Sequence, residues 1–111
     1  MNEKEELLNG LVMELRRGAV IISVLSQLAE PQYGYSLVQV LDEKGFAIDP
    51  GTLYPLLRRL EKQGLLESSW DTNESRPRKY YRLSTGGKAI YETLCVEWRN
   101  LVERMTMLIN N

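Results

Sequence analysis

The 111-residue chain contains no histidine and a single cysteine, Cys95. Without histidine it lacks the commonest general base and the commonest metal ligand, which excludes imidazole-dependent triads and argues against a zinc site. One cysteine cannot form an internal disulfide, as is typical of proteins from a reducing cytoplasm. The sequence also shows no paired-carboxylate site and no phosphate-binding glycine loop. We therefore expect no enzymatic activity, no cofactor and no metal.

Long hydrophobic runs are missing as well. The longest, "AVIISVL" at 19–25, is far shorter than the roughly 18 residues that a membrane-spanning helix needs. The first ten residues, "MNEKEELLNG", are acidic and lack the basic start of a secretory signal. The expected location is the cytoplasm, with no membrane partner.

Positive charge is concentrated in one part of the chain. The net charge is −1, yet residues 52–82 contain seven Lys or Arg against four Asp or Glu, so this segment is +3 and the remainder −4. A basic stripe on an otherwise acidic molecule indicates a polyanion that contacts one face only.

Two helices are expected before this basic segment. Apolar residues recur at spacings of three and four over 5–28, which predicts a single helix buried over much of its length. Pro31 and Gly34 then mark a turn. A short amphipathic helix follows at 35–44 and ends at Gly45.

A third helix is predicted to end at Gly64. It begins either at Pro50, with Asp49 as its N-cap, or at Thr52, because Pro55 removes a backbone donor one turn inside the longer version. At 100° per residue one face is formed by leucines, namely Leu53, Leu56, Leu57 and Leu60. The opposite face contains Gly51, Pro55, Arg58, Arg59 and Lys62. This face is either a solvated surface or a surface for phosphates and guanine edges.

Two strand-like runs follow, at 65–70 and 78–83, joined by the polar segment 71–77. They predict a β-hairpin with a protruding tip. The stretch "RPRKYYR" at 76–82 contains four cations and no acid. These charges either protect an edge strand from aggregation or contact a nucleic-acid backbone or minor groove.

The last helix is predicted from the cap Ser84 to about Ile109. Its apolar residues, Tyr91, Leu94, Trp98, Leu101, Met105 and Leu108, are spaced alternately by three and four. Such a heptad seam needs a partner helix. A chain of this length offers little other surface for it, so we infer a second subunit.

Three helices, a hairpin and a long helix predict a mainly α fold with a small β-hairpin. This order is typical of a winged helix-turn-helix, whose third helix enters the DNA major groove. The expected organisation is a winged helix-turn-helix domain at 1–84 and a dimerisation helix at 85–111, which form one folding unit with the N-terminal helix.

The segments "GTLYPLLRRLEKQGLL", "SRPRKYYRLSTGGK", "YGYSLVQVL" and "LRRGAVIISVL" closely resemble the PadR family of bacterial transcriptional regulators. The resemblance covers nearly the whole chain and departs only slightly, at Ser84, where the family often has threonine. The single C-terminal helix resembles that of the small subfamily. The resemblance implies a homodimeric winged helix-turn-helix protein, usually a repressor, with double-stranded operator DNA as its partner. Two basic faces related by a dimer axis imply a palindromic operator.

Site residues follow from the same resemblance. It implies DNA contacts from Tyr35, Ser36, Thr52, Tyr54, Pro55, Arg58, Arg59, Lys62, Arg76, Arg78 and Lys79. Tyr54 is alternatively a packing residue. In the family the C-terminal helix packs on the partner's N-terminal helix, which implies an interface of Leu8, Leu11, Leu15, Leu94, Trp98, Leu101, Met105 and Leu108.

Some small PadR-like proteins bind planar aromatic effectors at the dimer interface. The matching residues here are Ala19, Ser23, Tyr91, Leu94, Trp98 and Val102. The alternative for this aromatic stripe is plain dimer core. The alternative for the whole chain is a winged-helix protein-interaction module that does not bind DNA.

Overall fold

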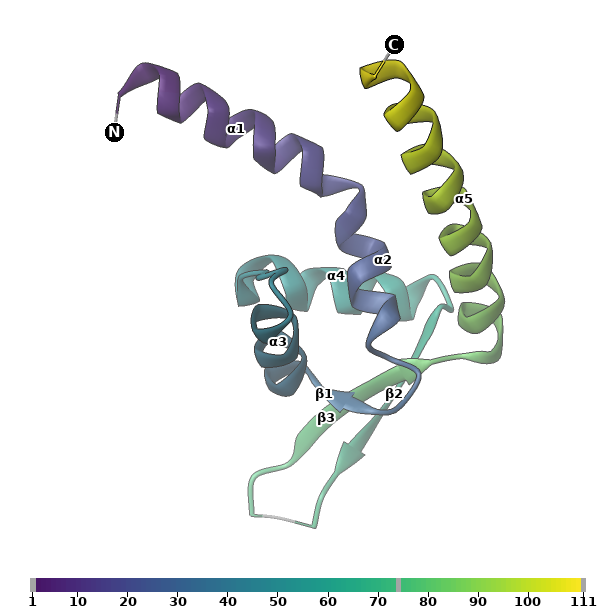
Figure 1. Ribbon diagram of the computed structural model, residues 1–111. Helices are drawn as coiled ribbons and strands as arrows, with labels where there is room; N and C mark the ends of the chain where they lie inside the picture. The colour runs from purple at the N-terminus through teal and green to yellow at the C-terminus, as the bar shows by residue number, and fades with distance from the viewer. Residues whose placement is uncertain (1, 74, 111) are drawn as a thin grey trace.

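The computed structural model describes residues 2–73 and 75–110 (Figure 1). Within them the elements follow in the order α1 (Glu3–Arg17), α2 (Ala19–Ser26), β1 (Gln32–Tyr33), α3 (Gly34–Glu43), α4 (Pro50–Lys62), β2 (Leu66–Asp71), β3 (Arg78–Leu83) and α5 (Thr85–Ile109). The expected mainly α fold with a small β-hairpin is confirmed. None of the described helices is long and apolar enough to cross a bilayer.

The core lies where α2, α3 and α4 pack together over the sheet. Its fully buried side chains come mainly from these helices and include Val24, Leu25, Leu28, Leu37, Leu53, Leu57 and Leu60. Apolar burial is the main stabilising term in such a core. The two amphipathic helices predicted at 35–44 and before Gly64 are therefore confirmed as α3 and α4.

The single helix expected over 5–28 is wrong, because α1 and α2 are separate elements that meet at Gly18. The backbone of Gly18 stays in the right-handed helical region, at φ −68° and ψ −28°, so the chain bends there without leaving helical space. Burial also changes at this point. In α2, Val24 and Leu25 are buried, whereas α1 buries none of its residues. The prediction that this helix is buried over much of its length is therefore wrong for α1.

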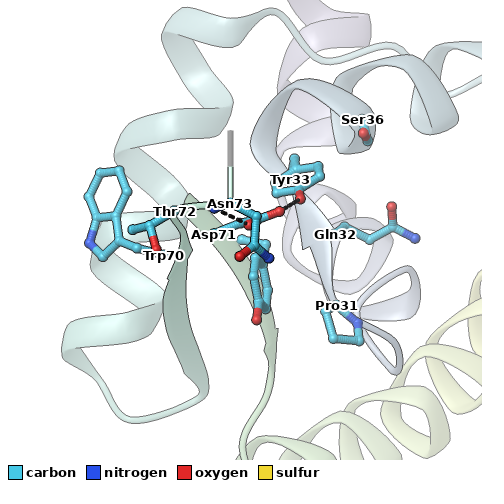
Figure 2. Close-up of a pocket in the computed structure, with 9 residues that line it drawn as sticks. Pro31, Gln32, Tyr33, Ser36, Trp70, Asp71, Thr72 and Asn73 are labelled. Atoms are coloured by element: carbon cyan, nitrogen blue, oxygen red, sulfur yellow. Dashed lines mark hydrogen bonds between the residues drawn. The ribbon is translucent and has the colours of Figure 1, made fainter. Parts of the chain in front are cut away.

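A third strand, β1, extends the expected hairpin. The sheet order is β1-β3-β2, and β1 pairs antiparallel with β3, with Gln32 opposite Tyr81 and Tyr33 opposite Tyr80. The Tyr33 hydroxyl donates a hydrogen bond of 2.6 Å to the Asp71 carboxylate at the end of β2 (Figure 2). The turn expected at Pro31 and Gly34 thus contains a short strand that fixes the start of α3 to the hairpin.

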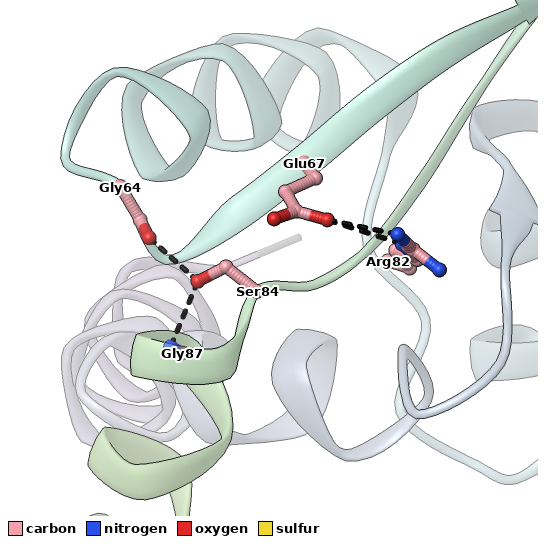
Figure 3. Close-up of polar contacts among 5 residues, drawn as sticks. All are labelled: Gly64, Glu67, Arg82, Ser84 and Gly87. Carbon is pink, nitrogen blue, oxygen red and sulfur yellow. Dashed lines mark hydrogen bonds and ion pairs between the residues drawn. The ribbon is translucent and has the colours of Figure 1, made fainter.

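The base of the hairpin is fastened to the start of α5 (Figure 3). The Ser84 hydroxyl accepts from the backbone N–H of Gly87 at 2.9 Å and donates to the carbonyl of Gly64 at 2.6 Å. This geometry confirms Ser84 as the N-cap of the last helix. A Cβ atom on Gly87 would lie 1.9 Å from the carbonyl oxygen of Leu65. The absence of a side chain at position 87 therefore allows α5 to start directly against the end of the α4 turn.

The two terminal helices project from this body (Figure 1). The Cα radius of gyration is 16.4 Å, against about 13 Å for a compact chain of 100 residues. The difference arises because α1 and the outer part of α5 extend away from the core and diverge from each other. Their apolar side chains are consequently left uncovered.

Candidate nucleic-acid interface

Helix α4 begins at Pro50, so the longer of the two expected versions is correct. The Asp49 carboxylate accepts the backbone N–H of Thr52 at 2.9 Å and its hydroxyl at 3.1 Å. Pro50 occupies the first turn, where no N–H is needed. Pro55 lies inside the helix and cannot donate to the carbonyl four residues before it. Pro55 and Gly51, whose carbonyl is left without this donor, are both exposed. Water can therefore reach the carbonyl.

The two faces of α4 differ sharply. Its four leucines are at most 9% exposed, which anchors the helix. The opposite face exposes Arg58, Arg59 and Lys62. These three cations form no ion pair with any residue that the structure describes. Their charges are therefore available to an external anion.

A groove of about 550 Å³ lies beside α4, between the start of α3 and the hairpin. Six of the eleven predicted DNA-binding residues line it: Tyr35, Ser36, Tyr54, Arg76, Arg78 and Lys79. The other five, Thr52, Pro55, Arg58, Arg59 and Lys62, are exposed on α4. The fold thus gathers residues from three separate segments on neighbouring surfaces.

The aromatic residues of this groove have different roles. Tyr35 is 67% exposed, and its hydroxyl accepts a hydrogen bond from Gln39. Tyr54 is half-buried and packs against the core. A Cβ on Gly34 would lie 2.4 Å from the Tyr54 ring, so glycine is needed where α3 begins. The alternative that Tyr54 is a packing residue is supported by this contact.

Lys79 lines the groove but already has a partner. Its ammonium lies 3.2 Å from the Glu61 carboxylate of α4 and 5.2 Å from the centre of the Tyr81 ring. Ser68 of β2 donates a hydrogen bond to the other oxygen of the same carboxylate. The hydrogen bond from Ser68 lowers the pKa of Glu61 despite the opposing effect of burial, and Lys79 lowers it further. Glu61 therefore links α4 to both strands of the hairpin as an ionised group.

A second groove, of about 800 Å³, lies on the hairpin near its tip (Figure 2). The Asp71 carboxylate in this groove accepts hydrogen bonds from the Tyr33 hydroxyl and from the backbone N–H of Asn73, and these bonds lower the pKa of Asp71. The Arg78 guanidinium lies 5.4 Å from the centre of the Tyr33 ring. Of the predicted DNA-binding residues this groove contains Ser36 alone. The 550 Å³ groove is therefore the better candidate for a DNA-binding surface.

The predicted hairpin tip at 71–77 includes Glu74, which lies outside the described residues.

All the predicted dimer residues except Leu94 are exposed. On α1 the exposed fractions are 60% for Leu8, 53% for Leu11 and 81% for Leu15. On α5 they are 44% for Trp98 and Met105, 48% for Leu101 and 66% for Leu108, while Leu94 is half-buried. Exposed leucines in such numbers on two helices are typical of a protein–protein contact surface.

The predicted effector residues lie on two contacting helices. Ala19 and Ser23 belong to α2, and Tyr91, Leu94, Trp98 and Val102 to α5. Tyr91 and Leu94 pack against the core, whereas Trp98 and Val102 are each 44% exposed. The Ser23 hydroxyl donates to the carbonyl of Val20 at 2.7 Å. The group is thus partly core and partly uncovered surface.

Sequence reasoning did not identify Glu61 as part of this region. It lies at the border of the two faces of α4 and appeared as one more acid in a charged run. Its partners, Ser68 and Lys79, are seven and eighteen residues away. Only the pairing of β2 with β3, which sets Ser68 opposite Tyr81 and Trp70 opposite Lys79, brings them to the same carboxylate. Alternation groups Ser68 with Trp70 on one strand and Lys79 with Tyr81 on the other, but the register of the hairpin is needed to place the two groups on one face.

Comparison with known proteins places these observations in a family. Residues 21–93 match the transcriptional regulator PadR-like family. The chain is 40% identical over 77 residues to the transcriptional regulator Rv3488 of Mycobacterium tuberculosis, an alignment that covers 68% of this chain and 72% of that protein.

Solved structures agree with this match. A PadR family transcriptional regulator from Eggerthella lenta is 45% identical, has a TM-score of 0.90 and overlaps 96% of this chain and 95% of its own. Bacillus subtilis PadR in complex with operator DNA has a TM-score of 0.65 over 70% of this chain and 46% of that chain. At 18% identity it shares the fold. On the family match, the identity to a curated regulator and the fold together, the chain belongs to the PadR-like family of transcriptional regulators.

Proposed function

We propose that this regulator binds a palindromic operator as a cytoplasmic homodimer and represses transcription. The observation that carries the proposal is the exposed basic face of α4, where Arg58, Arg59 and Lys62 lie opposite four buried leucines. A helix anchored in this way presents its cations to a polyanion without strain. The Bacillus subtilis relative that was solved with operator DNA has the same fold.

In this proposal α4 enters the major groove and the hairpin contacts the adjacent backbone. The guanidinium groups of Arg58 and Arg59 are suited to guanine edges and phosphates, and Lys62 to phosphates. The proposed contacts are Tyr35, Ser36, Thr52, Tyr54, Pro55, Arg58, Arg59, Lys62, Arg76 and Arg78. Lys79 belongs to the same groove, but its ammonium is bound by Glu61. We therefore do not assign it a phosphate in the complex.

The proposed dimer uses α5 and the partner's α1. Support comes from the exposed apolar residues of both helices and from the absence of any buried residue in α1. In this organisation residues 1–84 form the winged helix-turn-helix domain and residues 85–111 the dimerisation helix, with Met1 and Asn111 outside the described residues. A two-fold axis through α5 would present two α4 helices to half-sites about one helical turn apart, or a multiple of it.

A planar aromatic effector is proposed at the same interface. Trp98 and Val102 supply the uncovered apolar surface, and Ala19 and Ser23 supply small side chains on the contacting helix α2. Binding there would shift the relative position of the two α5 helices and hence the spacing of the two α4 helices. Quenching of Trp98 emission by planar aromatic compounds tests this site. Trp70 also emits, so Trp98→Phe is the control and should abolish the response.

Fluorescence anisotropy with labelled duplex DNA at several salt concentrations tests DNA binding itself. Each released phosphate counterion contributes a slope of about −0.9 to log K against log salt. We expect a steep negative slope for specific and random duplexes alike. Absence of salt-sensitive binding to either duplex would refute the proposal and favour a winged-helix protein-interaction module.

A further inference from the structure

Glu61 holds together three elements of the proposed DNA-binding surface. One carboxylate oxygen pairs with the Lys79 ammonium of β3 at 3.2 Å, and the other accepts the hydroxyl of Ser68 from β2. Glu61 itself lies in the last turn of α4, one residue before Lys62. The contact therefore fixes the position of the hairpin relative to the helix that we propose enters the major groove.

Without Glu61, Lys79 would be one more cation in the DNA groove. It lines the same 550 Å³ groove as Arg76 and Arg78. Its side chain is 30% exposed and that of Glu61 is 33% exposed. A lysine has a long, flexible stem and a strongly hydrated charge, so a free Lys79 ammonium would reach for phosphate.

Both partners are charged at neutral pH. Burial acts to lower the pKa of Lys79, but the hydrogen bond with Glu61 and the nearby Tyr81 outweigh it, so that this pKa is raised. Hydrogen bonding from Ser68 and the charge of Lys79 lower the pKa of Glu61. The ion pair is therefore present at neutral pH.

We propose that Glu61 is a specificity-determining residue, which holds Lys79 away from phosphate and fixes the hairpin against α4. The inference rests on the proposed DNA-binding function. Phosphate contacts carry no sequence information and strengthen binding to every duplex equally. Withholding one such contact therefore lowers affinity for specific and random DNA alike, whereas the fixed hairpin keeps the base-reading residues of α4 in register and so adds to specific affinity alone. Glu61 thus raises the ratio of specific to non-specific affinity.

The test compares Glu61→Gln with a matched control, Glu67→Gln. Glutamine keeps an oxygen that accepts from Ser68 but loses the charge that binds Lys79. Glu67 pairs with Arg82 at 3.1 Å (Figure 3). It neighbours Ser68 on β2 and so points to the opposite face of the hairpin. Both variants add one unit of net positive charge and free one cation, but only Glu61→Gln frees it on the proposed DNA face.

Anisotropy titrations would use a duplex selected from a random pool by the wild-type protein and a random-sequence duplex of the same length. For Glu61→Gln we expect roughly threefold to tenfold tighter binding to random DNA at low salt, and a log–log salt slope steeper by about 0.9. The ratio of specific to random affinity should fall. Glu67→Gln should leave the slope at the wild-type value, and Glu61→Gln combined with Lys79→Met should restore it.

Equal slopes for Glu61→Gln and Glu67→Gln would overturn the inference, as would a steep slope that persists in the double variant. If Glu61→Gln does not fold, as judged by its thermal melt, Lys79→Met alone decides. A slope shallower by about 0.9 in that variant would mean that Lys79 already contacts phosphate, which contradicts the inference, and an unchanged slope supports it. Failure of the wild-type protein to bind any duplex would instead refute the proposed function.

Discussion

Helix α4 and the terminal helices α1 and α5 share leucines at helical spacing but differ completely in burial. Leu53 and Leu57 of α4 are fully buried, whereas Leu15 of α1 is 81% exposed and Leu108 of α5 is 66% exposed. Periodicity shows that a helix has an apolar face. Whether the same chain covers that face depends on where the helix lies in the fold. Here α4 crosses the core and the terminal helices project from it, so one pattern supports folding and the other is proposed to support assembly.

The largest expected effect concerns assembly. Leu101 lies on α5, is 48% exposed and is not part of the core. In the proposed dimer, Leu101→Glu would place a carboxylate from each subunit in the apolar interface, at a cost of several kcal/mol per ion. We expect the molar mass to fall from twice 12.8 kDa to that of one chain, with helix content retained. Light scattering after size exclusion, together with far-ultraviolet circular dichroism, measures both. A dimer of unchanged affinity would show that α5 does not form the interface.

Leu57→Ala tests the buried leucines of α4. This side chain is 0% exposed, and truncation leaves a cavity in a packed core. We expect the free energy of unfolding to fall by about 2–5 kcal/mol. Urea denaturation at two protein concentrations measures it. The loss of unfolding free energy should be the same at both concentrations, because Leu57 packs within its own chain. A loss that grows on dilution would instead place Leu57 in the interface between subunits.

Gly87→Ala tests the junction between the two regions. A Cβ there would lie 1.9 Å from the Leu65 carbonyl, so α5 must move away from the end of the α4 turn. Overpacking of this kind costs about 1–3 kcal/mol of unfolding free energy. Gly86→Ala is the matched control, since the nearest atom to its Cβ would be the Ser84 hydroxyl at 4.0 Å. That substitution should be neutral or stabilising by up to about 1 kcal/mol. Equal thermal midpoints for the two variants would contradict the close contact.

The sequence predicts what depends on neighbouring residues and misses what depends on distant ones. The leucine face of α4 and the caps Asp49 and Ser84 are set by local spacing and side-chain chemistry, and the structure confirms them. Strand β1 has two residues, too few for any alternation. The exposure of Leu15 depends on the bend at Gly18, which carries no sequence signal beyond one glycine in a helical pattern. Glu61 and Lys79 meet only because α4 packs on the hairpin.

Arg59→Ala tests whether the exposed basic face of α4 contributes to DNA binding and not to folding stability. Arg59 is exposed and forms no ion pair with the described residues, so its loss should change the unfolding free energy by no more than about 0.5 kcal/mol. If it contacts a base edge, binding to the selected duplex should weaken by about 1–3 kcal/mol and specificity should relax. Anisotropy with selected and random duplexes measures both. Unchanged affinity for each duplex would remove Arg59 from the interface.

The smallest expected effect is the pH dependence that the Glu61 contact adds to folding. Its pKa is lowered in the folded protein, so the stabilisation is fully present above the unfolded value of 4.5 and is lost as pH falls through the lower, folded value. The pair is about one third exposed, which limits the contribution to below about 1 kcal/mol.

We expect the difference in unfolding free energy between the wild type and Glu61→Gln to be largest at neutral pH and to vanish in acid. Urea denaturation from pH 7 to pH 3 measures this difference. Glu67→Gln, which removes an ion pair that is more than half exposed, serves as the matched control for the loss of a carboxylate. A difference for Glu61→Gln that stays constant with pH would mean that its charge does not stabilise the contact between α4 and the hairpin.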